Sequence, residues 1–146
     1  MGITELLGNR LLVNSILAWM LAQVIKTVIY AMIHRRIDIR RLFGDGGMPS
    51  GHSATVTALC VTAGVEYGCG SAVFAVSAIL AVIVMHDAMG VRLEAGKHAK
   101  AINELFELFS SDEKTDVKFK EFLGHTPLQV CFGALLGLAV ALVLSL

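Results

Sequence analysis

The chain has 146 residues, of which 55% are hydrophobic, and its formal net charge at pH 7 is zero. This length fits one domain, and a mean hydropathy of +0.71 is too high for an ordinary soluble protein. The balanced charge gives no support to a nucleic-acid-binding role. The composition therefore predicts an integral membrane protein whose single domain covers residues 1–146.

Four apolar runs follow one another along the chain. Residues 11–33 are long enough to cross a bilayer and lack the basic start and cleavage site of a removable signal peptide. The other runs lie near residues 52–68, 71–87 and 127–146, and the run at 52–68 is short for a span. We expect an all-α bundle with about four transmembrane helices.

Polar loops at residues 34–51 and 88–126 separate these runs. Between Ala99 and Phe109, apolar residues recur at helical spacing with charged residues opposite them, which predicts an amphipathic interfacial helix. The charged stretch 110–121 is expected to be a loop. Of the 12 Lys and Arg residues, all but Arg10 and Lys26 lie in the two polar loops. The positive-inside tendency therefore predicts that these loops face the cytoplasm.

Two glycines of the last apolar run are expected to act in helix packing and not in a turn. Gly133 and Gly137 stand in G-x-x-x-G spacing, which marks a helix-packing face more often than a ligand site.

Residues 46–53, Gly-Gly-Met-Pro-Ser-Gly-His-Ser, join the first polar loop to the second apolar run. The glycines and the proline predict a tight turn that leads into the first turn of a helix. The N–H groups at a helix N-terminus attract anions, and Ser50 and His52 would add a hydroxyl and a proton donor. The alternative is an ordinary helix cap at a membrane boundary.

Further polar residues are expected on the same side of the membrane: Lys26, Asp87, Arg92 and His125. Lys26 lies within an apolar run, where a lysine is costly unless it snorkels, pairs or serves a site. Together these residues suggest a site for a negatively charged headgroup, with two histidines available for chemistry.

A divalent-metal site formed by Asp87, Glu94 and His98 is a minor alternative, because charge satisfaction at helix ends explains these residues equally well.

Three segments, GGMPSGHSA at 46–54, DAMGVRLEAGKHA at 87–99 and GHTPLQVCFGALLG at 124–137, resemble the divergent branch of the type 2 phosphatidic acid phosphatase and vanadium-haloperoxidase superfamily. The likeness extends from Gln23 to Gly137. The wider superfamily carries a lysine–arginine motif, then Pro-Ser-Gly-His, then Ser-Arg with a later His-x-x-x-Asp.

The resemblance implies roles for the first two motifs. Lys26 matches the first-motif lysine, and Arg36 or Arg40 is only a loose substitute for the missing Arg-Pro. In the second motif, which matches in full, His52 would protonate the leaving oxygen. Ser50 and the N–H of Gly51 would hold phosphate oxygens.

The third motif is split by an insertion that contains the expected amphipathic helix. Arg92 would be its arginine, which binds phosphate oxygens, and His125 its nucleophile. Gln129 occupies the position of the aspartate that normally orients the histidine. Glutamine can hydrogen-bond an imidazole but brings no negative charge, and Asp87 is a candidate to supply one.

The resemblance implies a phosphatase acting on a lipid phosphomonoester or diphosphate of the phosphatidic acid, phosphatidylglycerophosphate or polyprenyl phosphate class. It would proceed through a phosphohistidine, with no metal or other cofactor, in a bacterial cytoplasmic membrane. The expected partners are this substrate and membrane lipids, and the small-residue faces are compatible with a homodimer. The alternatives are a catalytically weak lipid-phosphate-binding or assembly protein, which Gln129 favours, and a small transport or channel subunit, which only Lys26 indicates.

Overall fold

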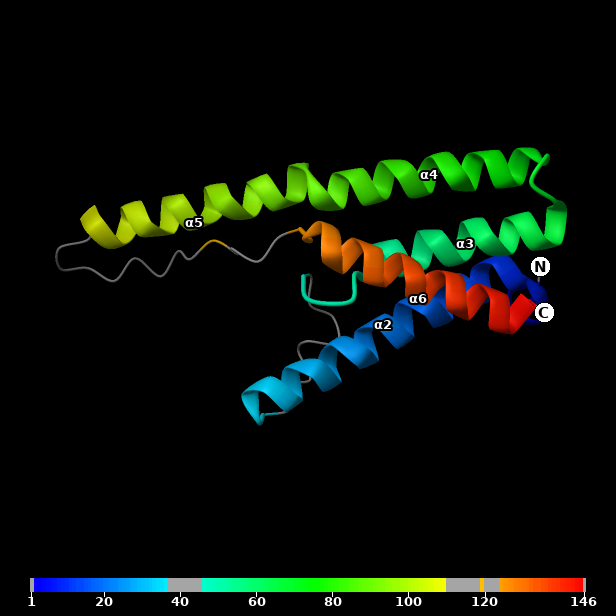
Figure 1. Ribbon diagram of the computed structural model, residues 1–146, viewed down its shortest axis with the longest axis horizontal. Coiled ribbons are helices and arrows are strands. Elements are labelled where there is room, and N and C mark those ends of the chain that lie inside the picture. Colours follow the sequence, from blue (N-terminus) through cyan, green and yellow to red (C-terminus); the bar gives the residue numbers. More distant parts are fainter. Residues whose placement is uncertain (1, 37–45, 110–118, 120–123, 146) are drawn as a thin grey trace.

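The computed structural model describes residues 2–36, 46–109, 119 and 124–145, and all the regular structure in these ranges is helical. Six helices follow in chain order: α1 (Ile3–Gly8), α2 (Arg10–His34), α3 (Gly51–Tyr67), α4 (Ala72–Met89), α5 (Val91–Phe109) and α6 (Pro127–Ser145). The expected all-α fold is confirmed, and α2, α3, α4 and α6 run in alternating directions (Figure 1). The two termini lie together at one end, and the turn before α3 and the start of α6 lie toward the other (Figure 1).

Three helical segments are long and apolar enough to cross a membrane: Arg10–His34, Ala72–Leu108, which joins α4 to α5, and Pro127–Ser145. Helix α3 has 17 residues and is about 26 Å long, a little less than the hydrocarbon thickness of a bilayer. The four-span count therefore remains a prediction for α3, whereas the membrane character of the bundle is established.

Helix α3 is the central element, because it packs against α2, α4 and α6. The contacts use small side chains. Ala54 and Ala58 of α3 are fully buried together with Ala18, Ala22 and Ala141 of the neighbouring helices. Small residues let helix backbones approach closely in a membrane, where van der Waals packing drives association.

The two spaced glycines of α6 pack directly on the α3 backbone. A β-carbon built at Gly137 would clash with the carbonyl oxygen of Ala54 and lie 3.0 Å from the nitrogen of Ala58. One built at Gly133 would clash with the carbonyl oxygen of Ser50. This confirms the helix-packing role predicted for both glycines, and it fixes α6 against the start of α3.

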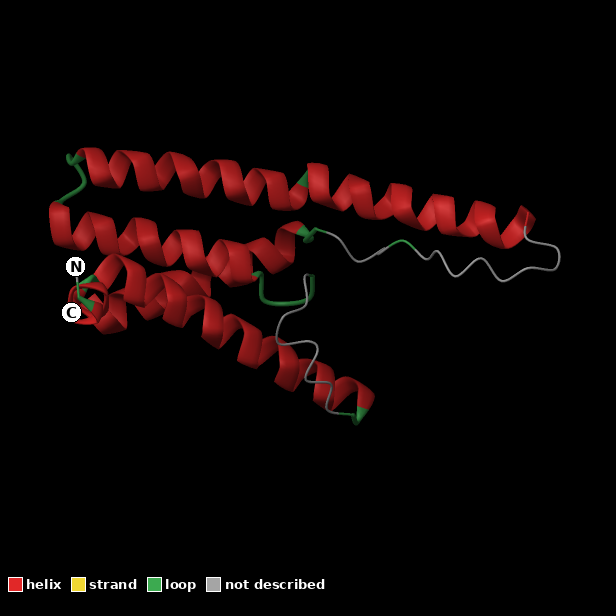
Figure 2. Cartoon of the chain, turned by 180° about the vertical axis from the view of Figure 1, so that it is seen from behind, coloured by secondary structure: helices red, strands yellow, loops and turns green. Residues whose placement is uncertain are grey.

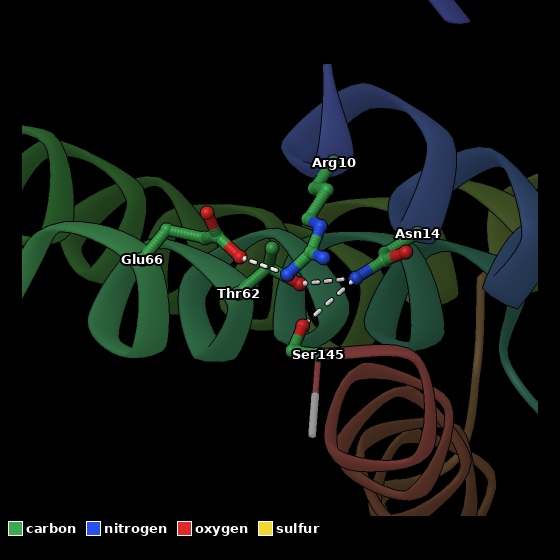
Figure 3. Close-up of polar contacts among 5 residues, drawn as sticks. All are labelled: Arg10, Asn14, Thr62, Glu66 and Ser145. Carbon is green, nitrogen blue, oxygen red and sulfur yellow. Dashed lines mark hydrogen bonds and ion pairs between the residues drawn. The ribbon is translucent and has the colours of Figure 1, made fainter. Parts of the chain in front are cut away.

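Buried polar side chains join three helices at the end that carries the termini (Figure 3). Asn14 of α2 is 3% exposed, and its Nδ2 donates to Thr62 Oγ1 at 3.1 Å and to Ser145 Oγ at 3.0 Å. Arg10 and Glu66 form a more exposed ion pair beside them, at 2.8 Å. This cluster, which the sequence analysis did not identify, holds α2, α3 and α6 together.

Helix α5 begins eight residues earlier than the amphipathic helix expected from Ala99, so the prediction that residues 88–98 form a loop was wrong. Only Gly90 separates α4 from α5, and its N–H donates to His86 O at 2.9 Å while its carbonyl accepts from Glu94 N at 3.0 Å. Charges at helical spacing pair along the exposed surface of α5, as Lys97 does with Glu94 at 2.6 Å. Such ion pairs stabilise a solvent-exposed helix. The loop was predicted because this segment contains no apolar run.

Helix α5 continues away from the bundle in nearly the direction of α4 (Figure 2). Among the helices, it packs on α4 alone. Asn103 hydrogen-bonds both the N–H and the carbonyl of Phe119 at 2.9 Å, so the returning chain lies along α5 at this point. The rest of the predicted loop 110–121 and Arg40 lie outside the described residues.

Candidate functional site

The rings of His52 and His125 face each other at the end of the bundle opposite the termini. Their centroids are 5.8 Å apart, and their planes meet at 65° in an edge-to-face arrangement. His52 is the second residue of α3, and His125 precedes α6 by two residues. His125 is 2% exposed, whereas His52 is only partly buried. The structure thus brings together the two histidines that the sequence analysis assigned to one site.

The turn before α3 is formed by residues in the left-handed backbone region and is capped by Ser50. Gly46 and Gly47 have φ angles of 77° and 82°, which side chains disfavour. Ser50 is fully buried, and its Oγ accepts from Ser53 N at 3.3 Å. Its own N–H donates to Gln129 O at 3.0 Å. Ser50 therefore caps α3, as the alternative interpretation held, and its phosphate-binding role remains a prediction.

The turn packs against one face of α2. A β-carbon on Gly47 would lie 3.2 Å from Lys26 Cγ, and one on Gly51 would lie 3.4 Å from Trp19 Cδ1 and 3.9 Å from Gln23 Oε1. Lys26 is only 8% exposed and Gln23 only 6%. Lys26 is thus buried beneath the turn, which favours a role in the site over snorkelling to the membrane surface.

The chain returning to α6 docks on the junction of α4 and α5. His125 N donates to Ala88 O at 2.8 Å, which satisfies a carbonyl near the end of α4. Gly124 has a φ angle of 84°, and a β-carbon there would lie 2.6 Å from Leu93 Cα and 2.7 Å from the carbonyl carbon of Arg92. This approach, which only glycine permits, brings the two halves of the split third motif together.

Arg92 and Asp87 form an ion pair beside this junction, with Nε and Oδ2 2.7 Å apart and the two side chains 50% and 41% exposed. From the sequence, Asp87 was a candidate source of negative charge for His125. In the structure, the carboxylate of Asp87 is paired with Arg92, and the Nδ1 of His125 lies 3.2 Å from Oε1 of Gln129 instead. Asp87 is thus placed to orient the arginine.

Gln129 closes a capping box at the start of α6. Its Oε1 accepts from Thr126 N at 3.1 Å, and its own N–H lies 3.4 Å from Thr126 Oγ1. The Thr-Pro-Leu-Gln sequence is the signature of this motif, with proline at the first helical position. The sequence therefore carries the signal for this cap, although the cap was not predicted from it.

The capping box also places a hydrogen-bond acceptor beside the ring of His125. A backbone N–H can only donate, so the Gln129 atom facing Thr126 N is the carbonyl oxygen. The same oxygen faces His125 Nδ1 at 3.2 Å, so it is placed to accept a hydrogen bond from that nitrogen.

The surroundings of His125 favour a neutral ring. Burial is the main cause that lowers the pKa of His125 below its usual value, and the nearby charges of Lys26 and His52 lower it further. Hydrogen bonds to Gln129 and to the backbone of Gly47 oppose the shift. The net direction is downward, so an unprotonated imidazole is available at neutral pH.

The alternative metal site is not assembled in the structure. The described residues contain no group of three or more His, Cys, Asp or Glu side chains placed to hold a metal ion. Asp87 is paired with Arg92, and Glu94 is paired with Lys97. His98 lies exposed on α5.

These features define a helical membrane protein with a cluster of histidine, lysine and helix N-terminus at one end of its bundle. The chain matches the divergent PAP2 family over residues 7–140 and belongs to that family, as its three motifs predicted. It is 44% identical over 153 residues to a protein of Bacillus subtilis (strain 168) described as "Uncharacterized membrane protein YuiD", with 97% of each chain covered. The comparison with solved structures gave no match.

Proposed function

We propose that this protein is a lipid-phosphate phosphatase that hydrolyses a phosphomonoester or diphosphate headgroup through a phosphohistidine on His125. The observation that carries the proposal is the facing pair His52 and His125, with ring centroids 5.8 Å apart. A near-attack contact to phosphorus and a hydrogen bond to the leaving oxygen together need about 6–7 Å between the two reacting nitrogens. Both histidines are thus close enough to contact one small headgroup, and membership of the divergent PAP2 family supports the same reaction.

In the first step, the Nε2 lone pair of His125 attacks phosphorus, and the bond from phosphorus to the lipid oxygen breaks. His52, in its protonated form, gives its proton to the departing oxygen. Lys26 and Arg92 balance the charge of the phosphoryl oxygens, with Asp87 orienting Arg92, and the N–H of Gly51 at the start of α3 adds a donor. Phosphoryl transfer depends chiefly on such positioning and charge stabilisation.

In the second step, His52 is neutral and takes a proton from a water molecule whose oxygen attacks phosphorus. The phosphorus–nitrogen bond breaks, and inorganic phosphate leaves. His125 returns to its neutral form and His52 to its protonated form. Gln129 holds the Nδ1 proton of His125 throughout, so the ring keeps its orientation.

A lipid substrate fits the position of the site at one end of an apolar bundle, because its tail can stay in the bilayer while its headgroup meets the cationic residues. Phosphatidic acid, phosphatidylglycerophosphate and polyprenyl phosphates all present such a headgroup. We place the site at the cytoplasmic face of a bacterial cytoplasmic membrane, because the segments that flank it carry most of the Lys and Arg residues.

The test is phosphate release from a panel of lipid phosphates by the purified protein in detergent, with and without vanadate or a chelator. We expect His125→Ala and His52→Ala to lower turnover by 100-fold or more, on the order of the loss from removing general acid–base catalysis. His98→Ala is the matched control, because this exposed histidine on α5 lies outside the site. Parent rates in both site variants would contradict the proposal.

A second candidate is a lipid-phosphate-binding protein without turnover. Gln129 favours it, because the amide that orients His125 supplies no negative charge to stabilise a protonated or phosphorylated ring. This function would be favoured over catalysis if the parent protein bound a lipid phosphate saturably and released no phosphate. The binding should also depend on Lys26.

A further inference from the structure

Gln23 carries a buried oxygen that the proposed mechanism does not use. The side chain is 6% exposed, and within the described part of the chain Oε1 has no hydrogen-bond partner. An acceptor buried without a donor is destabilising, and most buried polar groups in proteins are satisfied. An unsatisfied oxygen of this kind therefore points to a donor that arrives with a ligand.

The oxygen lies at the start of α3. It is 3.9 Å from the β-carbon position of Gly51, and Gln23 precedes Lys26 by three residues on the same face of α2. The N–H groups of a helix N-terminus and the ammonium of Lys26 attract an anion to this place. A carbonyl oxygen in the same place repels a fully deprotonated anion. It can instead accept a hydrogen bond from an anion that still carries a proton.

Building on the phosphatase function above, we propose that Gln23 is a specificity-determining residue that accepts a hydrogen bond from the P–OH group of a singly protonated phosphoryl headgroup. A phosphomonoester has its second pKa near 6, so both the protonated and the deprotonated forms are present around neutral pH. Lys26 and Arg92 recognise the charge of the headgroup, and Gln23 recognises its proton. Sulfate, which has the same shape but no hydrogen at neutral pH, is then the poorer ligand.

Replacement of Gln23 by methionine separates a ligand-binding role from a structural one. Methionine has a similar length but no carbonyl oxygen. We expect Gln23→Met to raise the thermal stability of the ligand-free protein, because an unsatisfied acceptor is removed. It should also weaken phosphate binding by about threefold to tenfold, as expected for one lost hydrogen bond, and leave sulfate binding unchanged.

The experiment measures how inorganic phosphate and sulfate each raise the unfolding temperature of the detergent-solubilised protein at pH 7, from which the two affinities follow. The parent should prefer phosphate, and Gln23→Met should lose this preference. Gln23→Glu keeps an acceptor and adds negative charge, so it should increase the ratio of phosphate to sulfate affinity. Asn14→Leu is the matched control: it removes a buried amide of α2 at the other end of the bundle and should leave the ratio unchanged.

An unchanged ratio in both Gln23 variants would overturn the assignment of Gln23, and so would a parent that binds the two anions equally. Because the readout is equilibrium binding, it is independent of turnover. A parent that releases phosphate from lipids but shows no anion preference would leave the phosphatase function standing without this role for Gln23.

Discussion

A single amide oxygen of Gln129 connects the folding of α6 to the chemistry of the site. It accepts from Thr126 N within the capping box and faces the Nδ1 of His125. The residue that caps the helix therefore also positions the ring of the buried histidine. An aspartate here would bring charge, whereas the glutamine orients the ring without charging it.

Gln129→Glu tests the effect of that missing charge. Glutamate keeps the capping-box geometry and places a carboxylate beside His125, which favours the protonated ring and raises its pKa. We expect the acidic limb of the rate–pH profile for phosphate release to move to higher pH. Gln129→Leu is the comparison variant, which loses the cap and about 0.5–2 kcal/mol of stability. A profile identical to that of the parent in Gln129→Glu would show that this position does not act on His125.

The lowered pKa of His125 also predicts how stability depends on pH. The unfolded chain takes up the proton near pH 6.5, whereas the folded protein resists it because the ring is buried. Stability contributed by the neutral ring is therefore present above about pH 6.5 and is lost as the pH falls below it, by at most about 1.4 kcal/mol per pH unit.

Unfolding temperatures between pH 7.5 and 5.5 measure this dependence. The parent should lose stability on acidification, and His125→Gln should lose less, because its side chain does not titrate. Equal losses in the two proteins would contradict a depressed pKa at His125.

At the scale of single residues, the sequence motifs predicted that His52 and His125 lie close together. They did not predict contacts that arise only when distant segments pack against each other. The Pro-Ser-Gly-His match correctly placed His52 near His125. The positive φ of Gly124 and its contact with Leu93 have no local sequence signal, because both depend on the approach of α6 to the junction of α4 and α5. The burial of Gln23 depends in the same way on the turn that crosses α2.

The contact between α3 and α6 is the element-scale feature on which the site depends. Gly133 packs beside Ser50, and Gly137, about one helical turn further along α6, packs beside Ala54. The spacing of these glycines predicted a packing face but not its partner. Helix bounds were also close for the apolar runs, because length and hydropathy determine them. The start of α5 was not predicted, because its charged residues are compatible with a loop or with an exposed helix. The ion pairs between these charges are what favour the helix.

Gly137→Ala should destabilise the bundle by about 1–3 kcal/mol, as expected when a well-packed contact is overfilled. The added methyl group would meet the backbone of Ala54 and force α6 away from α3. Gly70→Ala is the matched control, because a β-carbon there has nothing within 4 Å. The measurement is the unfolding temperature of each variant in detergent. Equal temperatures for Gly137→Ala and the parent would contradict the tight packing of these two helices.

At the scale of the whole molecule, the alternating helices place the termini at one end and the starts of α3 and α6 toward the other (Figure 1). The histidine pair lies at these two helix starts. The same arrangement puts the exposed Cys69, between α3 and α4, near the end with the termini. An even number of membrane crossings, predicted from the apolar runs, is consistent with this arrangement. The distribution of basic residues predicts which end faces the cytoplasm.

Cysteine labelling in intact cells tests this orientation. In a protein whose only cysteine is Cys69, we expect a membrane-impermeant maleimide to react without permeabilisation. In a protein whose only cysteine is introduced by Glu107→Cys on exposed α5, reaction should require permeabilisation. The two proteins are each other's controls, and the reverse pattern would place the site on the outer side of the membrane.

The central claim, that His52 and His125 act on one phosphorus atom, is tested most directly by trapping the intermediate. Purified protein is mixed with a lipid phosphate carrying a radioactive phosphoryl group and is denatured in alkali within milliseconds to seconds, because phosphohistidine is stable to base and labile to acid. We expect labelled phosphate on His125 in the parent and none in His125→Ala. Turnover by the parent with no label on the protein, or equal labelling of His125→Ala, would contradict the mechanism.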